Sequence, residues 1–121
     1  MVTSLRPDAT IDLRDALAAF EGALARRTAA LIDEVAHYPT PIARCDEQLT
    51  QLIEQRTQAV ARLRALRNVA AAARHTPPHA WLAQVARWLD NYPSPEDADE
   101  AASVAHLRSA AASAIAAAAR P

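Results

Sequence analysis

The chain has 121 residues, 51% of them hydrophobic and one of them glycine, and a formal net charge of −1. The length is typical of one domain, and the alanine-rich composition favours helices. The single glycine excludes glycine-rich phosphate loops, and the single cysteine excludes an internal disulfide and favours the cytoplasm.

The basic residues are 13 in number and all are arginine, which is typical of a GC-rich, bacterial-type genome. The first residues lack the apolar region of a signal peptide, and no run reaches the roughly 18 apolar residues of a membrane span. We therefore expect a cytoplasmic protein without a membrane segment.

The first predicted helix covers residues 10–37. Large apolar residues recur in it at spacings of three and four, which is the period of one helix face: Leu13, Leu17, Phe20, Leu24, Leu31 and Val35. A turn at 38–41, Tyr-Pro-Thr-Pro, ends this helix because the residue before a proline is disfavoured in the α region. Thr40 can then cap a second helix that has Pro41 at its first position.

The second predicted helix covers residues 41–74 and carries a matching apolar stripe. The two helices together predict a long antiparallel hairpin with coiled-coil-like packing. If the hairpin folds about residue 40, Arg56 lies opposite Leu24 and within one turn of Glu21. We expect a polar layer at Arg56 and Glu21 that fixes the register, with an Arg56 head group extended into water as the alternative.

A break at 75–78, which contains the sequence Thr-Pro-Pro, precedes a short third helix at 78–91. Its large side chains share one face: Trp81, Val85, Trp88 and Leu89. Such a face either belongs to the core or binds a partner, since aromatic residues are favoured at interfaces. We take these four residues as the partner-binding candidates.

A second turn at 92–95, Tyr-Pro-Ser-Pro, leads to a fourth helix at 95–119, with Ser94 as the predicted cap. This helix is rich in alanine, so it buries little area and docks weakly. The sequence thus predicts one all-α domain over 1–121, built as a long and a short antiparallel hairpin. Its core is thin for its length, so we expect oligomerisation, most simply a homodimer, to complete a bundle.

No acidic residue stands between Glu54 and Asp90, a stretch that holds six arginines. In an antiparallel hairpin these arginines face the acids near the start of the chain, and this internal match is our main interpretation. The alternative is nucleic-acid binding, which a pI near 6.4 does not favour. The candidates for it are Arg62, Arg64, Arg67 and Arg74.

Glu34 and His37 form a Glu-x-x-His unit, the pattern of metal-binding helical bundles. The chain holds one such unit, so a metal site needs a symmetric dimer to supply the second. No nucleophile or general-base pattern accompanies it. We therefore expect a non-enzymatic interaction module without a cofactor, an adaptor, chaperone-like protein or regulatory subunit that binds a protein partner or itself.

Overall fold

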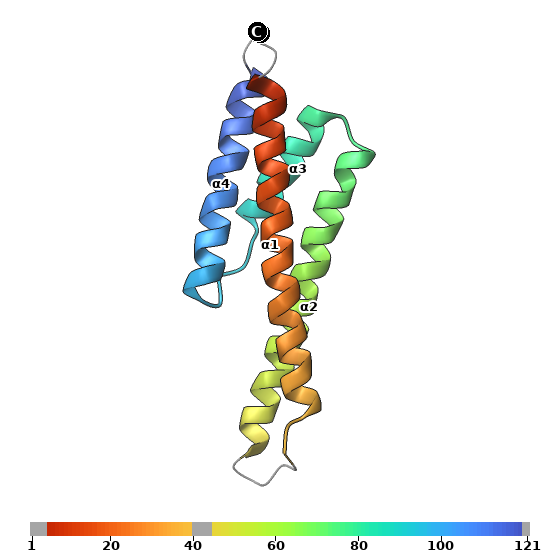
Figure 1. The fold of residues 1–121 in the computed structure, drawn as a ribbon, viewed down its shortest axis with the longest axis vertical. Coiled ribbons are helices and arrows are strands. Elements are labelled where there is room, and N and C mark those ends of the chain that lie inside the picture. The colour runs from red at the N-terminus through yellow and green to blue at the C-terminus, as the bar shows by residue number, and fades with distance from the viewer. Residues whose placement is uncertain (1–4, 40–44, 120–121) are drawn as a thin grey trace. The chain divides into compact units, whose positions relative to one another are not determined.

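The structure is a computed structural model that describes residues 5–39 and 45–119. In this part of the chain every regular element is helical, which confirms the all-α class (Figure 1). The elements, in chain order, are α1 (Leu5–Ala36), α2 (Cys45–Ala71), the 3₁₀ helix η2 (Ala72–Arg74), α3 (Pro78–Asp90) and α4 (Ala98–Ala119). None of these helices combines the length and the hydropathy that crossing a membrane requires.

The helix starts that the sequence predicts agree with the structure to different degrees. Helix α3 starts at Pro78, as the sequence predicts, because a proline at the first helical position loses no hydrogen bond. Helix α1 starts at Leu5, five residues earlier than predicted, and includes Pro7 in its first turn, where its missing N–H is not needed. The predicted cap at Thr40 lies outside the described residues.

Helix α4 begins at Ala98, three residues later than predicted. The Asp97 side chain accepts a hydrogen bond from the Glu100 backbone N–H at 2.8 Å, so Asp97 caps this helix. The Glu100 side chain in turn accepts the Glu96 backbone N–H at 2.6 Å. The arrangement resembles a capping box, except that Glu100 accepts the N–H of Glu96 and not that of the cap residue Asp97, and the cap has moved along the chain from the predicted Ser94.

The chain forms two compact units, and α1 and α2 contribute to both. The terminal unit comprises Met1–Phe20 and Asn68–Pro121, and the central unit comprises Glu21–Arg67.

The terminal unit buries apolar side chains from three helices. Helix α3 packs against η2 and α4, and the Trp81 indole N–H donates to the Val69 carbonyl at 2.8 Å. The buried apolar side chains are Leu13, Ala16, Leu17 and Phe20 of α1, Trp81, Leu82, Val85 and Leu89 of α3, and Val104, Leu107, Ala111 and Ala114 of α4. Most of the large apolar side chains that are buried in the described part of the chain therefore belong to this unit.

The central unit is built from the second half of α1 and most of α2. Glu21 contacts Arg67 at one end of this unit, and Tyr38 contacts Gln48 at the other, so the two helix segments run antiparallel. Its buried side chains are Leu24, Thr28, Leu31, Ala59, Leu63 and Leu66. Two helices alone leave this core narrow, with a flank on each side.

Candidate functional site

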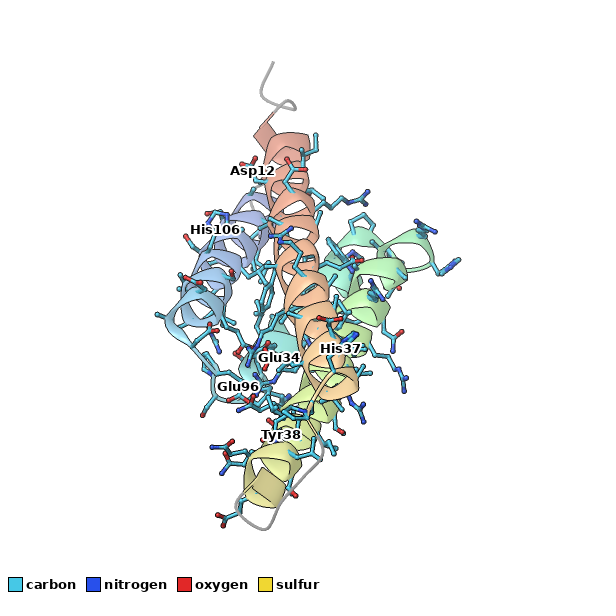
Figure 2. All side chains as sticks on the ribbon, turned by 60° about the horizontal axis from the view of Figure 1, so that its bottom comes forward. Asp12, Glu34, His37, Tyr38, Glu96 and His106 are labelled. Atoms are coloured by element: carbon cyan, nitrogen blue, oxygen red, sulfur yellow. The ribbon has the colours of Figure 1, made fainter. Side chains whose placement is uncertain are left out.

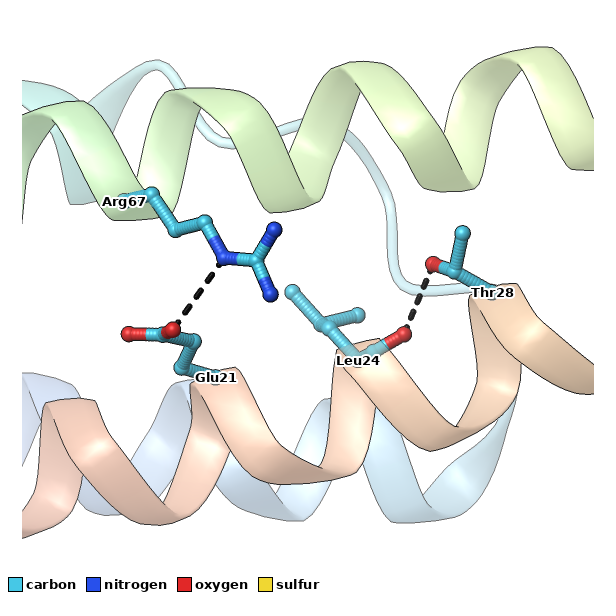
Figure 3. A network of polar contacts seen from close by, with 4 residues as sticks. All are labelled: Glu21, Leu24, Thr28 and Arg67. Atoms are coloured by element: carbon cyan, nitrogen blue, oxygen red, sulfur yellow. Dashed lines mark hydrogen bonds and ion pairs between the residues drawn. The ribbon is translucent and has the colours of Figure 1, made fainter.

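The Glu21–Arg67 ion pair marks one flank of the central unit (Figure 3). The Arg67 Nε donates to a Glu21 carboxylate oxygen at 3.1 Å, and both side chains are partly exposed. Beside the pair, the buried Thr28 hydroxyl donates to the Leu24 carbonyl at 2.7 Å. Residues that lie a whole number of helical turns from Glu21 or from Arg67 are therefore on the same flank as the pair.

Four apolar residues share that flank, and we call them the isoleucine flank: Ile32, Leu49, Ile53 and Val60. Ile32 follows Glu21 by eleven residues, which is three helical turns, and Val60 precedes Arg67 by seven, which is two. Ile53 lies seven residues before Val60, on nearly the same line. Ile32 is 46% exposed and Ile53 is 38% exposed. The flank is therefore apolar and accessible in the single chain.

The other flank of the central unit is polar. Its marker is the contact from the Tyr38 hydroxyl to the Gln48 side-chain oxygen, 3.1 Å long. Gln55 follows Gln48 by two turns, and Arg62 follows Gln55 by two more. The two flanks of one hairpin thus differ in chemistry, as expected when one flank meets water and the other meets a protein surface.

The expected contact between Arg56 and Glu21 does not form, because Glu21 pairs with Arg67 instead. Arg56 lies eleven residues before Arg67, roughly 16 Å along α2. The reason is the register: Glu21 lies opposite Arg67 and Tyr38 opposite Gln48, so α2 is shifted by several residues from the pairing that a fold about residue 40 predicts. Arg56 is half-buried beside the isoleucine flank and opposite Ile32.

The predicted partner-binding residues lie largely in the core of the terminal unit. Trp81 and Leu89 are each 2% exposed and Val85 is fully buried, so none of the three offers a surface to a partner. Only Trp88 is half-buried, and its ring contacts Tyr92 edge-on with centroids 5.5 Å apart. The helical spacing of these residues grouped them on one face, but it could not decide whether that face is covered by the core or by a partner.

A buried polar cluster joins the end of α3 to the start of α4. The Tyr92 hydroxyl donates to the Glu100 carboxylate, which is 4% exposed. The Tyr92 ring also packs against Phe20, with centroids 5.9 Å apart. Because the buried Glu100 carboxylate accepts hydrogen bonds from the Tyr92 hydroxyl and the Glu96 backbone N–H, this cluster stabilises the fold and offers no open site.

The cavities on the terminal unit include two of similar size. One, of about 370 Å³, lies between α1 and α4 and is lined by Asp12, Asp15, His106, Ser109 and Ser113 together with alanines. Figure 2 shows the labelled Asp12 and His106 on these two helices. The other, also about 370 Å³, is lined by Ile11, Arg14, Trp81 and Leu82 among others. The first is lined by two carboxylates, and the second by the cation of Arg14 and by no acidic residue.

The nucleic-acid candidates do not share one helix face. Arg62 and Arg67 are five residues apart on α2, which turns them about 140° from each other. Arg67 is paired with Glu21, and Arg62 also has a polar partner. Arg64 is exposed, and the exposed Arg74 belongs to the terminal unit. Nucleic-acid binding by these arginines stays a prediction.

The metal candidates are exposed at the end of the central unit, where Figure 2 labels Glu34 and His37. The His37 Nδ1 lies 3.1 Å from a carboxylate oxygen of Asp33, one turn earlier. Within residues 5–39 and 45–119, no three His, Cys, Asp or Glu side chains are grouped as metal ligands. The site proposed for a symmetric dimer stays a prediction.

Sequence reasoning missed the exposed isoleucines and Arg14. The signal for the isoleucines was present as their spacing from Glu21 and Arg67, but its use required the register of the hairpin. Comparison of the chain with protein-family models, curated proteins and solved structures gives no match. The functional proposals below therefore rest on the geometry of the two units.

Proposed function

We propose that the protein is a helical interaction module that associates with a second copy of itself through the isoleucine flank. One observation carries this proposal: Ile32 and Ile53 are accessible on the same flank of a narrow two-helix unit. Burying a side chain of this size contributes about 1.5–3 kcal/mol. Two such flanks placed together form a four-helix arrangement, the simplest way to enclose both.

The charges along α2 favour a second copy as the occupant of this flank. Asp46 and Glu47 stand near the start of α2, and its second half carries Arg64 and Arg67. When two α2 helices pair antiparallel, the acidic start of each lies beside the arginine-rich half of the other. This complementarity favours antiparallel pairing and opposes the parallel one, in which like charges meet. Arg56, half-buried at the edge of the flank, contributes its alkyl stem to the same contact.

The role that follows is one of binding rather than catalysis. We infer an adaptor, chaperone-like or regulatory protein that acts as a homodimer in the cytoplasm. The cytoplasmic assignment rests on the single cysteine and on the absence of lengthy apolar runs from the sequence.

Light scattering coupled to gel filtration, over a dilution series, tests the self-association directly. We expect the mass of a dimer at high concentration for the wild type. Replacing Ile53 by Glu places a charge within the apolar contact, so the dissociation constant should rise by roughly tenfold or more. Gln55→Glu is the matched control, because it adds the same charge two residues away on the polar flank and should leave the dimer intact.

Circular dichroism shows whether both variants keep their helices, as the exposure of both positions predicts. A wild-type protein that remains monomeric over the whole dilution series contradicts the proposal. So does a Gln55→Glu variant that dissociates as readily as Ile53→Glu, because the contact would then not lie on the isoleucine flank.

A further inference from the structure

The cavity beside Trp81 in the terminal unit has the composition of a small-molecule site. Its volume of about 370 Å³ lies within the range of roughly 300–1,000 Å³ that such sites occupy. Its apolar wall includes Ile11, Pro78, Trp81 and Leu82. Ile11 is 51% exposed, although it lies on α1 among buried leucines. An isoleucine left this open beside an indole and a leucine offers apolar area to a ligand.

Arg14 gives this cavity its charge. Its guanidinium carbon lies 5.7 Å from the centroid of the Trp81 ring, a cation–π contact that holds the head group at the cavity. Across the described part of the chain, Arg14 makes no ion pair with a carboxylate. The nearest acids along α1, Asp12 and Asp15, line the other cavity. The guanidinium therefore keeps its N–H donors for an external anion.

Hydroxyl groups and further basic residues surround the same cavity. Thr10 and Thr76 are among its lining residues and supply two hydroxyls. Arg74 and His75 immediately precede Thr76, and His79 follows Pro78, while no acid occurs between Glu54 and Asp90. Arg14 is the charged residue among those that line the cavity, so the cavity attracts a ligand that carries a negative charge at one end.

We propose that this cavity binds a small amphipathic carboxylate, with its apolar body against the exposed Ile11, beside the Trp81 indole, and its carboxylate on Arg14. One guanidinium matches one carboxylate, which can accept two parallel hydrogen bonds from it. The threonine hydroxyls can donate to the same oxygens. The inference is independent of self-association, because the cavity belongs to the terminal unit and the isoleucine flank belongs to the central unit.

Octanoate is the probe, and the fluorescence of Trp81 is the readout. The chain has two tryptophans, so Trp88→Phe leaves Trp81 as the only indole. In this background octanoate should change the emission saturably. Octanol, which has the same chain without the charge, and octylamine, which has the opposite charge, should each bind at least about tenfold more weakly.

Arg14→Gln removes the charge and keeps most of the side-chain length, and it should weaken octanoate binding by at least about tenfold. Arg26→Gln, an exposed arginine on the same helix, is the matched control and should bind as the parent does. Ile11→Asn, a second variant at an exposed position, should weaken octanoate and octanol alike. Calorimetry of the wild type with octanoate checks that Trp88→Phe has not altered the site.

Three outcomes overturn the proposal. Octanoate does not produce a saturable signal below its micellar concentration; octanol binds as well as octanoate, which indicates apolar partition only; or Arg14→Gln binds octanoate as the parent does while retaining its helical circular dichroism.

Discussion

Arg67 donates to Glu21 over 3.1 Å although 46 residues separate the two in the chain. This contact, together with that of Tyr38 with Gln48 at the other end, shows which residues of α1 and α2 lie opposite each other in the central unit. It places Ile32 opposite Arg56 and brings Ile53 and Val60 to the same flank. The register of one ion pair thus determines which apolar side chains the hairpin leaves accessible.

We expect the Glu21–Arg67 pair to contribute a modest coupling energy. Both side chains are partly exposed, so a double-mutant cycle with Glu21→Gln and Arg67→Gln should give about 0.2–1 kcal/mol, decreasing as salt is added. Urea unfolding followed by circular dichroism measures each free energy of unfolding.

The control for this cycle is Arg56→Gln combined with Glu21→Gln. Arg56 lies three helical turns along α2 from Arg67, the partner of Glu21. The effects of Arg56→Gln and Glu21→Gln on the free energy of unfolding should therefore be additive. A coupling of Glu21 with Arg56 that equals or exceeds its coupling with Arg67 would mean that the hairpin folds about residue 40 in solution.

The hydroxyl of Tyr92 should matter much more to stability than that of the other tyrosine. Tyr92→Phe removes one of the donors to the Glu100 carboxylate, which is 4% exposed, so water cannot replace it. We expect a loss of about 1–3 kcal/mol in the free energy of unfolding, the usual effect of removing a hydrogen-bond donor from a buried charged acceptor. Thermal and urea unfolding of the variant measure it.

Tyr38→Phe is the matched change for this test, because Tyr38 donates to Gln48 at an exposed position. Water can replace the lost partner there, so the variant should lose less than about 1 kcal/mol. Equal losses in the two variants would contradict the assignment of Tyr92 and Glu100 to a closed cluster.

The sequence was sufficient for the fold class and for the helix face that becomes core. Alanine content and the spacing of apolar residues depend on local backbone geometry, which is why the helices and the stripe through Leu13, Leu17 and Phe20 could be predicted. Pro78 could be placed because its effect is confined to its own turn. The start of α4 could not, since both Ser94 and Asp97 are competent caps and tertiary packing of Glu100 decides between them.

The candidate sites were harder to predict because they depend on residues far apart in the chain. Helical period groups Trp81 with Val85 and Trp88, but the packing of α3 against α4 decides that Trp81 and Val85 are core. Likewise, the register in which α1 pairs with α2 decides the partner of Glu21. The cavity at Arg14 combines residues of α1 with residues near the start of α3, which no local pattern joins.

Gly22→Ala should stabilise the protein. Gly22 is the single glycine of the chain and lies inside α1, where glycine is less favourable than alanine by about 0.5–1 kcal/mol. A Cβ atom built there meets only a terminal nitrogen of Arg26, at 3.5 Å, an ordinary contact with a side chain that can move. The free energy of unfolding should therefore rise by about 0.5–1 kcal/mol, with the dimer mass unchanged.

The reverse change, Ala18→Gly at an exposed position of the same helix, should lower the free energy of unfolding by a similar amount. A Gly22→Ala variant that loses stability while Ala18→Gly behaves as expected would show that another surface approaches α1 closely at residue 22.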